Sequence, residues 1–342
     1  MFIGVALGIR AFWRTEPAVR ADDAYMAARK KEVILVTGGA GRLGRALVRR
    51  LLSDGREVRV LVDGKEDILS ITQGAVPYLG NIVDSAAMAR ACKDVDTVFH
   101  LAAIVSQYRL GSAEILRTNT MGTKVLLDAA NDAGANKLLF SSTLNVYGRV
   151  RKERLTETSE PRPTDTYGQS KALAEKEIIR SGINYTIFRM ATIYGPGFSN
   201  SFMKMFDMVR QGKAYIIGKG RNHIPLLHVS DAVNAFILAM DKRISTNSIY
   251  NLSDGQDYTQ EYLFDFIAGL IGTKRPDRHV HPMLVKAVSK SRGLDIDEVR
   301  FMTTDRLVDI SKAKKQLGWK PKMTIESDSS YLLAQWEAPP QR

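Results

Sequence analysis

The stretch VILVTGGAGRLG, residues 33–44, sets the architecture of the N-terminal half of this chain. Residues 33–37 have the composition of a buried parallel strand, and an amphipathic, helix-like run follows the glycines. Between them Gly38, Gly41 and Gly44 stand three residues apart, where a tight turn lets a phosphate approach bare backbone. The helix after such a turn presents unpaired N–H groups and the positive end of its dipole. The pattern predicts a site for the pyrophosphate of a dinucleotide.

A carboxylate ends the next apolar run, VRVLVD at 58–63. Asp63 lies where a carboxylate accepts hydrogen bonds from the ribose hydroxyls of an adenosine. It favours NAD over NADP, because a 2′-phosphate would meet a like charge. Arg42 offers a counter-charge, so NADP remains possible as the cofactor.

Strand-like and helix-like runs alternate from residue 33 to residue 190. This alternation predicts an α/β fold with a doubly wound parallel sheet, the Rossmann arrangement. After residue 195 the rhythm changes, which predicts a smaller, mostly helical lobe that covers the substrate. We expect an N-terminal extension at 1–30, a Rossmann domain at 31–195 and 223–255, a substrate-binding lobe at 196–222 and 256–330, and a tail at 331–342.

The composition excludes several kinds of site. Cys92 is the only cysteine, which rules out an intrachain disulfide and every multi-cysteine metal site, and the five histidines lack metal-ligand spacing. We therefore predict no metal. The net charge is +12, but the positive residues are scattered, with short runs at 149–154 and 311–315. We interpret these runs as solvated faces and expect no nucleic acid partner.

No apolar segment reaches the length of a transmembrane span. The N-terminal run at 1–9 is far shorter than the roughly 20 residues that cross a bilayer. The positive charges follow this run instead of preceding it, which is unlike a signal peptide. We expect a cytoplasmic protein that acts on a small molecule.

Tyr167 and Lys171 stand four residues apart in a helical pattern, which puts them on one face of the helix. Lowering a tyrosine pKa from near 10 to about 7 requires roughly 4 kcal/mol of preferential stabilisation of the phenolate. A neighbouring ammonium and an oxidised nicotinamide can supply it together. Hydroxyls at 141–143 end a predicted strand, where one of them can donate to a substrate oxygen.

These residues belong to a larger set of motifs. TGGAGRLG, Asn81-Ile82, HLAA, NTMGT, SSTLNVYG, YGQSK and FRMATIYGPG, in this order, resemble the extended short-chain dehydrogenase/reductase superfamily, which includes the NAD-dependent epimerases and dehydratases. The resemblance implies that Thr143 polarises the substrate oxygen, that Tyr167 is the general acid/base, and that Lys171 tunes it and holds the nicotinamide ribose. It implies cofactor contacts from Gly38, Gly41, Arg42, Leu43, Gly44, Asp63, Asn81, Ile82, Leu101, Ala102, Ala103, Asn119, Tyr167 and Lys171.

Two positions separate this chain from the nucleotide-sugar members of that superfamily. Those members carry an asparagine shortly before YGP, where this chain has Thr192. They also carry an arginine shortly before the His-Val pair, where this chain has Ile224 and Pro225, and Arg221 is out of register. These departures resemble the 3β-hydroxysteroid dehydrogenase and dihydroflavonol reductase branch, whose substrates carry no diphosphate.

We therefore expect hydride transfer between NAD(P) and a secondary alcohol or ketone of an apolar or polycyclic substrate. One alternative is a nucleotide-sugar 4-epimerase that retains NAD, and another is a non-catalytic dinucleotide-binding structural protein or sensor. Leu144 and Asn145 stand where an acidic residue would mark a dehydratase. The resemblance also implies a possible homodimer through helices at 116–133 and 167–180. The methionine-rich helix expected at 198–212 suits either core packing or an adaptable pocket.

Overall fold

The structure is a computed structural model that describes residues 32–105, 111–198, 201–285, 287, 291 and 296–337. From Glu32 onwards the chain forms one compact unit. The extension expected at 1–30 and the last five residues of the expected tail lie outside the described residues. Within the described ranges, no helix is both long and apolar enough to cross a membrane.

The strands are β1 (Val33–Thr37), β2 (Glu57–Val62), β3 (Val76–Leu79), β4 (Thr97–His100), β5 (Lys137–Thr143), β6 (Tyr185–Met190), β7 (Thr192–Tyr194), β8 (Ile216–Ile217), β9 (Leu226–His228), β10 (Ser248–Leu252) and β11 (His279–Val280). The helices are α2 (Arg42–Ser53), α3 (Lys65–Ile68), α4 (Ser85–Cys92), α5 (Ser112–Asp132), α6 (Thr166–Arg180), α7 (Ser201–Arg210), α8 (Val229–Asp241), α9 (Gln260–Leu270), α11 (Ile296–Met302) and α12 (Ser329–Glu337). Short 3₁₀ turns are η1 (Leu144–Tyr147), η2 (Arg243–Ser245) and η3 (Pro282–Leu284), and η4 (Ala313–Leu317) is a turn of π-helix.

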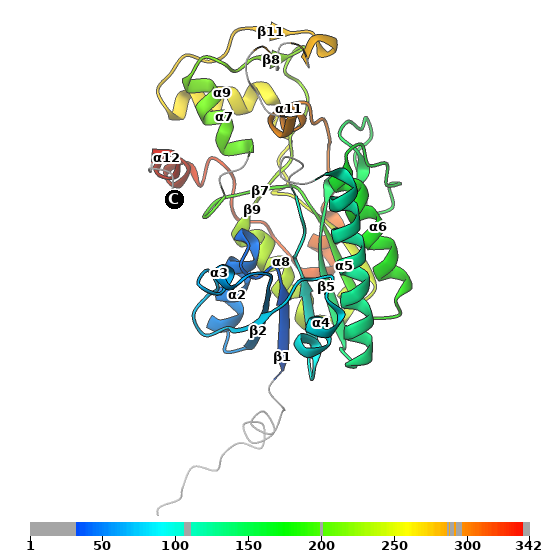
Figure 1. Cartoon of the computed structure of the whole chain (residues 1–342). Coiled ribbons are helices and arrows are strands. Elements are labelled where there is room, and N and C mark those ends of the chain that lie inside the picture. Colours follow the sequence, from blue (N-terminus) through cyan, green and yellow to red (C-terminus); the bar gives the residue numbers. More distant parts are fainter. Residues whose placement is uncertain are drawn as a thin grey trace, which may run out of the picture. The chain divides into compact units, whose positions relative to one another are not determined.

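Seven strands form one parallel sheet in the order β10-β6-β5-β4-β1-β2-β3. The chain starts at β1, runs outward to β3, and returns to the other side of β1 at β4. The predicted doubly wound Rossmann sheet is thus confirmed (Figure 1). In such a sheet the ligand cleft opens at the carboxyl ends of the strands, at the reversal between β1 and β4.

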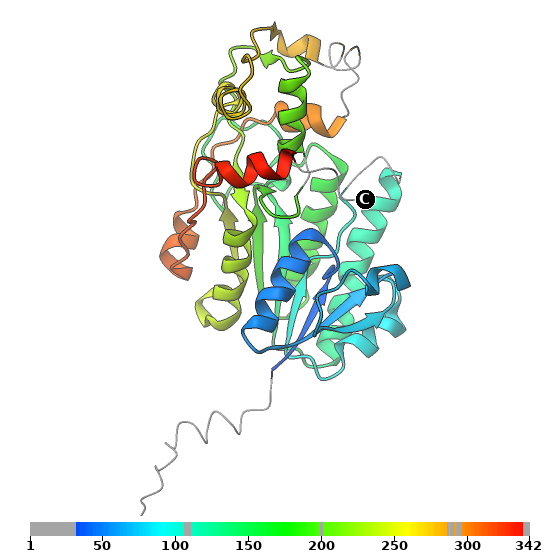
Figure 2. The same ribbon diagram turned by 90° about the vertical axis from the view of Figure 1, so that its left-hand side faces the viewer.

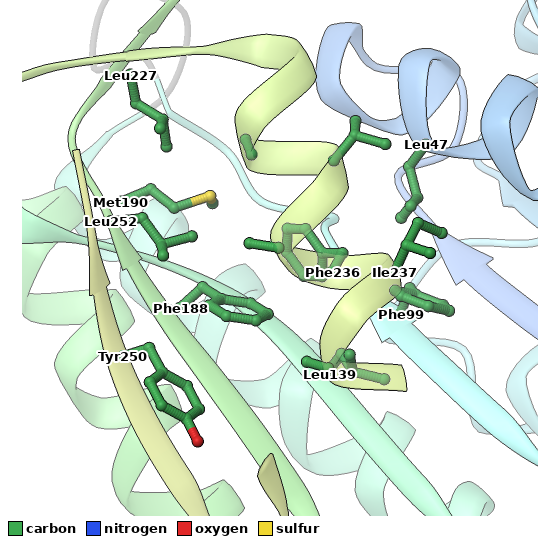
Figure 3. Close-up of a cluster of buried hydrophobic side chains, with 14 of the residues drawn as sticks. Leu47, Phe99, Leu139, Phe188, Met190, Leu227, Phe236, Ile237, Tyr250 and Leu252 are labelled. Carbon is green, nitrogen blue, oxygen red and sulfur yellow. The ribbon is translucent and has the colours of Figure 1, made fainter. Parts of the chain in front are cut away.

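Helices bury both faces of the sheet, which is why β1 and β4 consist entirely of buried residues. On one face α2 and α8 pack on the strands, and Phe236 of α8 contacts Phe188 of β6 edge-on, with ring centroids 4.7 Å apart (Figure 3). On the other face Met88 of α4, Leu126 of α5 and Ile178 of α6 belong to a second apolar cluster. Cys92, at the end of α4, is buried in that cluster.

A third apolar cluster belongs to the lobe beyond the carboxyl ends of the strands (Figures 1 and 2). Residues of α7, α9, α11 and α12 build it, and the methionines of α7 (Met203, Met205, Met208) are buried there as core. The first residues of the expected tail, 331–337, are part of helix α12. The indole N–H of Trp336 in this helix donates to the Asp207 carboxylate of α7. The exact domain boundaries stay a prediction.

Two features of the sheet region had no sequence signal. The strand β10 extends the sheet beside β6, and the short pair β7–β9 lies where the chain passes from the sheet to the lobe. The strand β4 ends at His100, so the residues Leu101, Ala102 and Ala103 belong to a loop. That loop faces the turn after β1.

Candidate active site

The turn after β1 is packed too closely for any side chain at its first glycine. Gly38 has φ of +73°, and a Cβ there would lie 2.6 Å from the backbone nitrogen of Ala102. A Cβ on Gly44 would clash with the carbonyl oxygen of Gly38. Gly41 is the N-cap of α2. It has no side-chain oxygen that could accept hydrogen bonds from the amides of the first turn, which include those of Arg42 and Leu43. This backbone cradle at the positive end of α2 fits a pyrophosphate.

The two residues expected to bind adenosine lie together beside this cradle. Asp63 follows β2 and Asn81 follows β3, the neighbouring strand. Nδ2 of Asn81 donates to Oδ1 of Asp63 over 2.8 Å, and the Asp63 side chain is exposed. Ile82 packs on Gly122 of α5, where a Cβ would lie 2.7 Å from the isoleucine side chain.

The loop after β4 carries three of the expected cofactor contacts: Leu101, Ala102 and Ala103. Asn119 of α5 holds this loop, because its Oδ1 accepts from the Ile104 nitrogen over 2.8 Å and its Nδ2 donates to the Ile104 carbonyl. The same Nδ2 donates to the Ser170 hydroxyl of α6 over 2.9 Å. Asn119 therefore ties the loop to α6, and its amide is fully engaged by the chain itself.

Before this loop, at the end of β4, lies a buried histidine whose contacts the sequence did not predict. His100 contacts the Thr37 hydroxyl through Nδ1 (2.8 Å) and the Thr123 hydroxyl through Nε2 (2.9 Å). Burial and the nearby Lys171 hold the pKa of His100 well below its usual range. The ring is therefore neutral and links β1, β4 and α5 through one donor and one acceptor.

Helix α6 carries the two residues expected at the reaction centre. Asp165 caps it by accepting from the Gly168 nitrogen over 2.7 Å. Tyr167 is half-buried in the first turn, and burial together with Asp165 raises its pKa. The phenol is therefore protonated at neutral pH in the protein alone.

Lys171 lies one turn further along α6 and is only 2% exposed. Its ammonium lies 3.9 Å from the centre of the Phe140 ring. Burial lowers the pKa of Lys171 to about 7, although the Glu175 carboxylate opposes the shift. The lysine is thus poised between its charged and neutral forms near neutral pH.

The hydroxyls at the end of β5 point to different places. Thr143 lines the cleft, and its Oγ1 accepts from the Asn145 nitrogen over 3.2 Å. Ser142 instead donates to Glu175, which also holds Arg189 of β6 through paired contacts of 2.6 and 3.1 Å. Because Glu175 stands two turns after Tyr167 on α6, this buried ion pair fixes α6 against β5 and β6.

Thr143 and Tyr167 share one cleft of about 360 Å³, and Lys171 follows one turn further along α6, behind its lining. Thr143 and Tyr167 line it from the sheet side, with Thr192 beside them, and Phe301 closes it from the lobe. Arg42 also lines it, so the cleft extends to the start of α2.

Two lining arginines, Arg149 and Arg306, were not expected at the site. The interpretation of 149–154 as a solvated face is wrong for Arg149, whose Nε is enclosed, and for Arg151, whose side chain is 11% exposed. No local pattern pointed to the two lining arginines: Arg149 directly follows the SSTLNVYG motif without belonging to it, and Arg306 lies more than 150 residues further along the chain.

These observations fit a bound dinucleotide. The glycine cradle would hold the pyrophosphate, and the Asp63–Asn81 corner would hold the adenosine. The helix with Tyr167 and Lys171 would lie at the nicotinamide end, beside the loop that Asn119 holds. A side chain at Gly38 or an acidic cap on α2 would have excluded this arrangement.

Comparison with known proteins agrees with this geometry. The model of the NAD-dependent epimerase/dehydratase family matches residues 34–253. A UDP-glucose 4-epimerase of Lactobacillus helveticus is 28% identical over 84% of this chain and 92% of its own length. A 3-beta-hydroxysteroid dehydrogenase of Mycolicibacterium neoaurum is 27% identical over 86% of this chain and 88% of its own length.

A solved structure supports the same assignment. The UDP-glucose 4-epimerase of Thermotoga maritima, determined with UDP-glucose, is 30% identical and superposes with a TM-score of 0.72, covering 88% of this chain and 97% of its own. The chain thus belongs to the NAD-dependent epimerase/dehydratase family of extended short-chain dehydrogenases/reductases, and it is an enzyme, a dehydrogenase/reductase or an epimerase, whose cofactor is NAD.

Proposed function

We propose that this enzyme transfers a hydride between NAD and the carbon of a secondary alcohol or ketone on an apolar or polycyclic, 3β-hydroxysteroid-like substrate. The observation that carries the proposal is that Thr143 and Tyr167 line one cleft, with Lys171 one turn further along the helix. Membership of the family sets aside the non-catalytic alternative.

Each of these residues has a distinct role in the proposal. The Thr143 hydroxyl donates to the substrate oxygen, and Tyr167 takes the proton of the alcohol or returns it to the ketone. When bound, NAD supplies the hydride acceptor and the positive charge of its oxidised ring. Lys171, buried beside Phe140, holds a second positive charge near Tyr167 and binds the nicotinamide ribose. Both charges lower the pKa of the phenol, which burial and Asp165 alone raise.

The walls of the cleft support an apolar substrate. Met190, Ile193 and Phe198 line it together with Thr192, which stands where nucleotide-sugar members have an asparagine. Ile224 and Pro225 are buried, so no cationic side chain comes from that segment. The apolar part of these walls suits a ring system.

The first prediction concerns Tyr167. We expect Tyr167→Phe to reduce turnover by about 10²- to 10⁴-fold, because the phenylalanine cannot transfer a proton. NAD affinity should stay within a factor of about three, since the ring is retained. The measurement is NAD reduction with a panel of sterol-like and flavonoid-like alcohols, beside calorimetric titration with NAD.

Tyr331→Phe is the matched control, because Tyr331 is 40% exposed on α12. It should leave both turnover and NAD affinity unchanged. Wild-type turnover in Tyr167→Phe would remove the proposed mechanism.

A nucleotide-sugar 4-epimerase remains the second candidate. The similarity to the UDP-glucose-bound Thermotoga maritima enzyme favours it, and so does Arg300, a fourth arginine of the cleft. An epimerase returns the hydride within one active site and keeps its NAD. A dehydrogenase must exchange NAD in every cycle, so retention of NAD distinguishes the two candidates.

We also propose that the enzyme forms a homodimer through α5 and α6. These helices pack side by side on one face of the sheet (Figure 1), and each exposes an apolar residue, Met121 (48%) and Leu173 (38%). A second copy would bury both side chains. The cytoplasmic location expected from the sequence stays a prediction.

A further inference from the structure

Two arginines from distant parts of the chain meet in the cleft. Arg149 follows η1, and Arg306 follows α11 of the lobe. The two segments pair as short extended strands: the Asp305 nitrogen donates to the Arg149 carbonyl over 3.0 Å, and Val150 forms a parallel bridge with Asp305. The pairing fixes both guanidinium groups at one wall of the cleft.

Arg306 is almost fully enclosed, with 6% of its surface exposed. Both of its terminal nitrogens donate to the same oxygen, Oδ1 of Asn145, over 3.2 Å each. The Nε atoms of Arg306 and of Arg149 are buried and make no hydrogen bond to the described part of the chain. Each guanidinium therefore keeps a donor that water does not reach.

Two carboxylates lie near this pair, Asp165 in the lining of the same cleft and Asp305 beside Arg306 in the chain, and each accepts a backbone hydrogen bond. Asp165 accepts from the Gly168 nitrogen as the cap of α6, and Asp305 accepts from the His223 nitrogen over 2.9 Å. Among the residues that the structure describes, no carboxylate oxygen lies within ion-pair distance of Arg149 or Arg306.

The electrostatics agree with this geometry. Burial lowers the pKa of Arg306 to about 10; Asp165 opposes that shift, and Arg149 adds to it. Enclosed cations are costly unless an anion pairs with them.

The pair lies next to the reaction centre. Asn145, which both terminal nitrogens of Arg306 contact, also donates its backbone N–H to Thr143. The Asn145 carbonyl packs against Gly168, the residue after Tyr167. Asn145 thus lies between the buried guanidinium of Arg306 and two of the residues that the proposed mechanism uses, Thr143 and Tyr167.

We propose that Arg149 and Arg306 bind a carboxylate of the substrate, close to the carbon that exchanges the hydride. This inference rests on the proposed function and narrows its substrate class to apolar secondary alcohols that carry an acid group. Both arginines line the cleft, and the planar donor geometry of a guanidinium matches the two oxygens of a carboxylate.

The test uses a ligand pair that differs only in charge. Wild-type protein saturated with NAD is titrated with cyclohexanecarboxylate and with cyclohexanecarboxamide, by calorimetry or ligand-observed NMR. We expect the carboxylate to bind at least about tenfold more tightly than the amide. Arg306→Leu and Arg149→Leu should each erase the preference, and Arg306→Lys should retain part of it, because the charge remains without the planar donors.

Arg162→Leu is the matched control. Its guanidinium is 68% exposed and pairs with Glu160 on the surface, so it removes the same charge without touching the cleft. It should leave the preference unchanged. The NAD affinity of every variant reports whether the fold is intact. Arg149→Leu alone tests the preference for the acid if Arg306→Leu, at the more deeply buried position, does not fold.

Three outcomes would overturn the proposal. They are equal affinity for acid and amide, no binding of the acid up to about 10 mM, and a preference that survives both leucine variants. UDP is the second probe. If UDP binding depends on both arginines while carboxylate binding does not, the pair serves a diphosphate and the carboxylate assignment is wrong.

This experiment separates the two proposals, because it needs no hydride transfer. Tyr167→Phe should keep the preference for the acid while losing turnover. A preference without oxidation of any alcohol would count against the proposed function alone, and turnover without a preference would count against the carboxylate site alone.

Discussion

The buried ammonium of Lys171 links the stability of this enzyme to its proposed chemistry. Lys171 is 2% exposed, and Glu175, the acid that lies one turn further along α6, is already paired with Arg189. Burial lowers the pKa of Lys171 to about 7. The protein therefore accepts a poorly solvated cation at the point where the proposed reaction needs one.

This arrangement predicts how the stability of the cofactor-free protein changes with pH. The folded protein releases the Lys171 proton near pH 7, whereas the unfolded chain keeps it until about 10.5. Between these values the unfolded chain binds more protons, so the free energy of unfolding rises with pH, and the full cost of burial is present below pH 7. Lys171→Met should melt roughly 5 to 10 °C above wild type at pH 6, with the difference shrinking towards pH 10. Calorimetry at both pH values measures it.

Lys176→Met provides the comparison, because Lys176 is exposed on the same helix. It should shift the melting temperature little at either pH. If Lys171→Met is less stable than wild type at pH 6, the lysine is stabilised by its surroundings and the burial argument is wrong.

At the scale of elements, local patterns predicted most of the sheet. The strand β1, the turn and α2 were predicted because the apolar run, the spaced glycines and the amphipathic run follow one another within about 20 residues of sequence. Helix α2 begins at Arg42, three residues before the predicted start, since the last glycine of the turn is already helical. The strand β10 was missed because its five residues alternate poorly and gain their burial only beside β6.

Two glycines with positive φ, one in the turn after β1 and one after α2, allow the effect of a crowded Cβ to be compared with that of backbone strain alone. Gly38 and Gly55 have nearly the same backbone, with φ of +73° and +74°, but a Cβ meets Ala102 at Gly38 and open space at Gly55. Gly55→Ala should cost about 1 kcal/mol of backbone strain and leave NAD binding intact. Gly38→Ala should cost more, because the loop that carries Ala102 must move, and should weaken NAD binding by at least about tenfold. Thermal melts and NAD titrations measure both.

The difference between the two alanine variants isolates the effect of crowding from that of backbone strain. Equal losses of stability with unchanged NAD affinity would show that the contact between the turn and the loop after β4 does not shape the cofactor site.

At the scale of the whole molecule, the cleft depends on contacts that no local pattern reveals. The motifs predicted Thr143, Tyr167 and Lys171 because a strand end and one helix face carry them. The meeting of Arg149 with Arg306 follows from the pairing of segments that lie more than 150 residues apart. Such pairing leaves no periodic trace in a single sequence.

Residues of the sheet and of the lobe both line the cleft. Whether the enzyme releases NAD therefore belongs to the scale of the whole molecule. We expect the purified protein to contain no dinucleotide and to bind added NAD reversibly, as a dehydrogenase must. Native mass spectrometry, followed by denaturation to identify any released nucleotide, makes the measurement. NAD retained through purification would favour the epimerase instead.

The same spectra report the proposed dimer. A mass of two chains that falls to one chain in Met121→Asp would support an interface on α5 and α6. Ile244→Asp is the control, since Ile244 is 57% exposed on η2, away from those helices.

The buried pair between Glu175 and Arg189 has a consequence for engineering. It fastens the strand that ends at Thr143 to the helix that bears Tyr167, so the spacing of the reacting groups is inherited as a unit. The lobe contributes Phe301 to the opposite wall, and among the residues that the structure describes Phe301 makes no contact with that ion pair. Arg306 of the lobe, by contrast, contacts Asn145 beside Thr143. New substrates are therefore best sought by randomising Phe301 and keeping Arg306, so that every variant keeps the spacing of Thr143 and Tyr167.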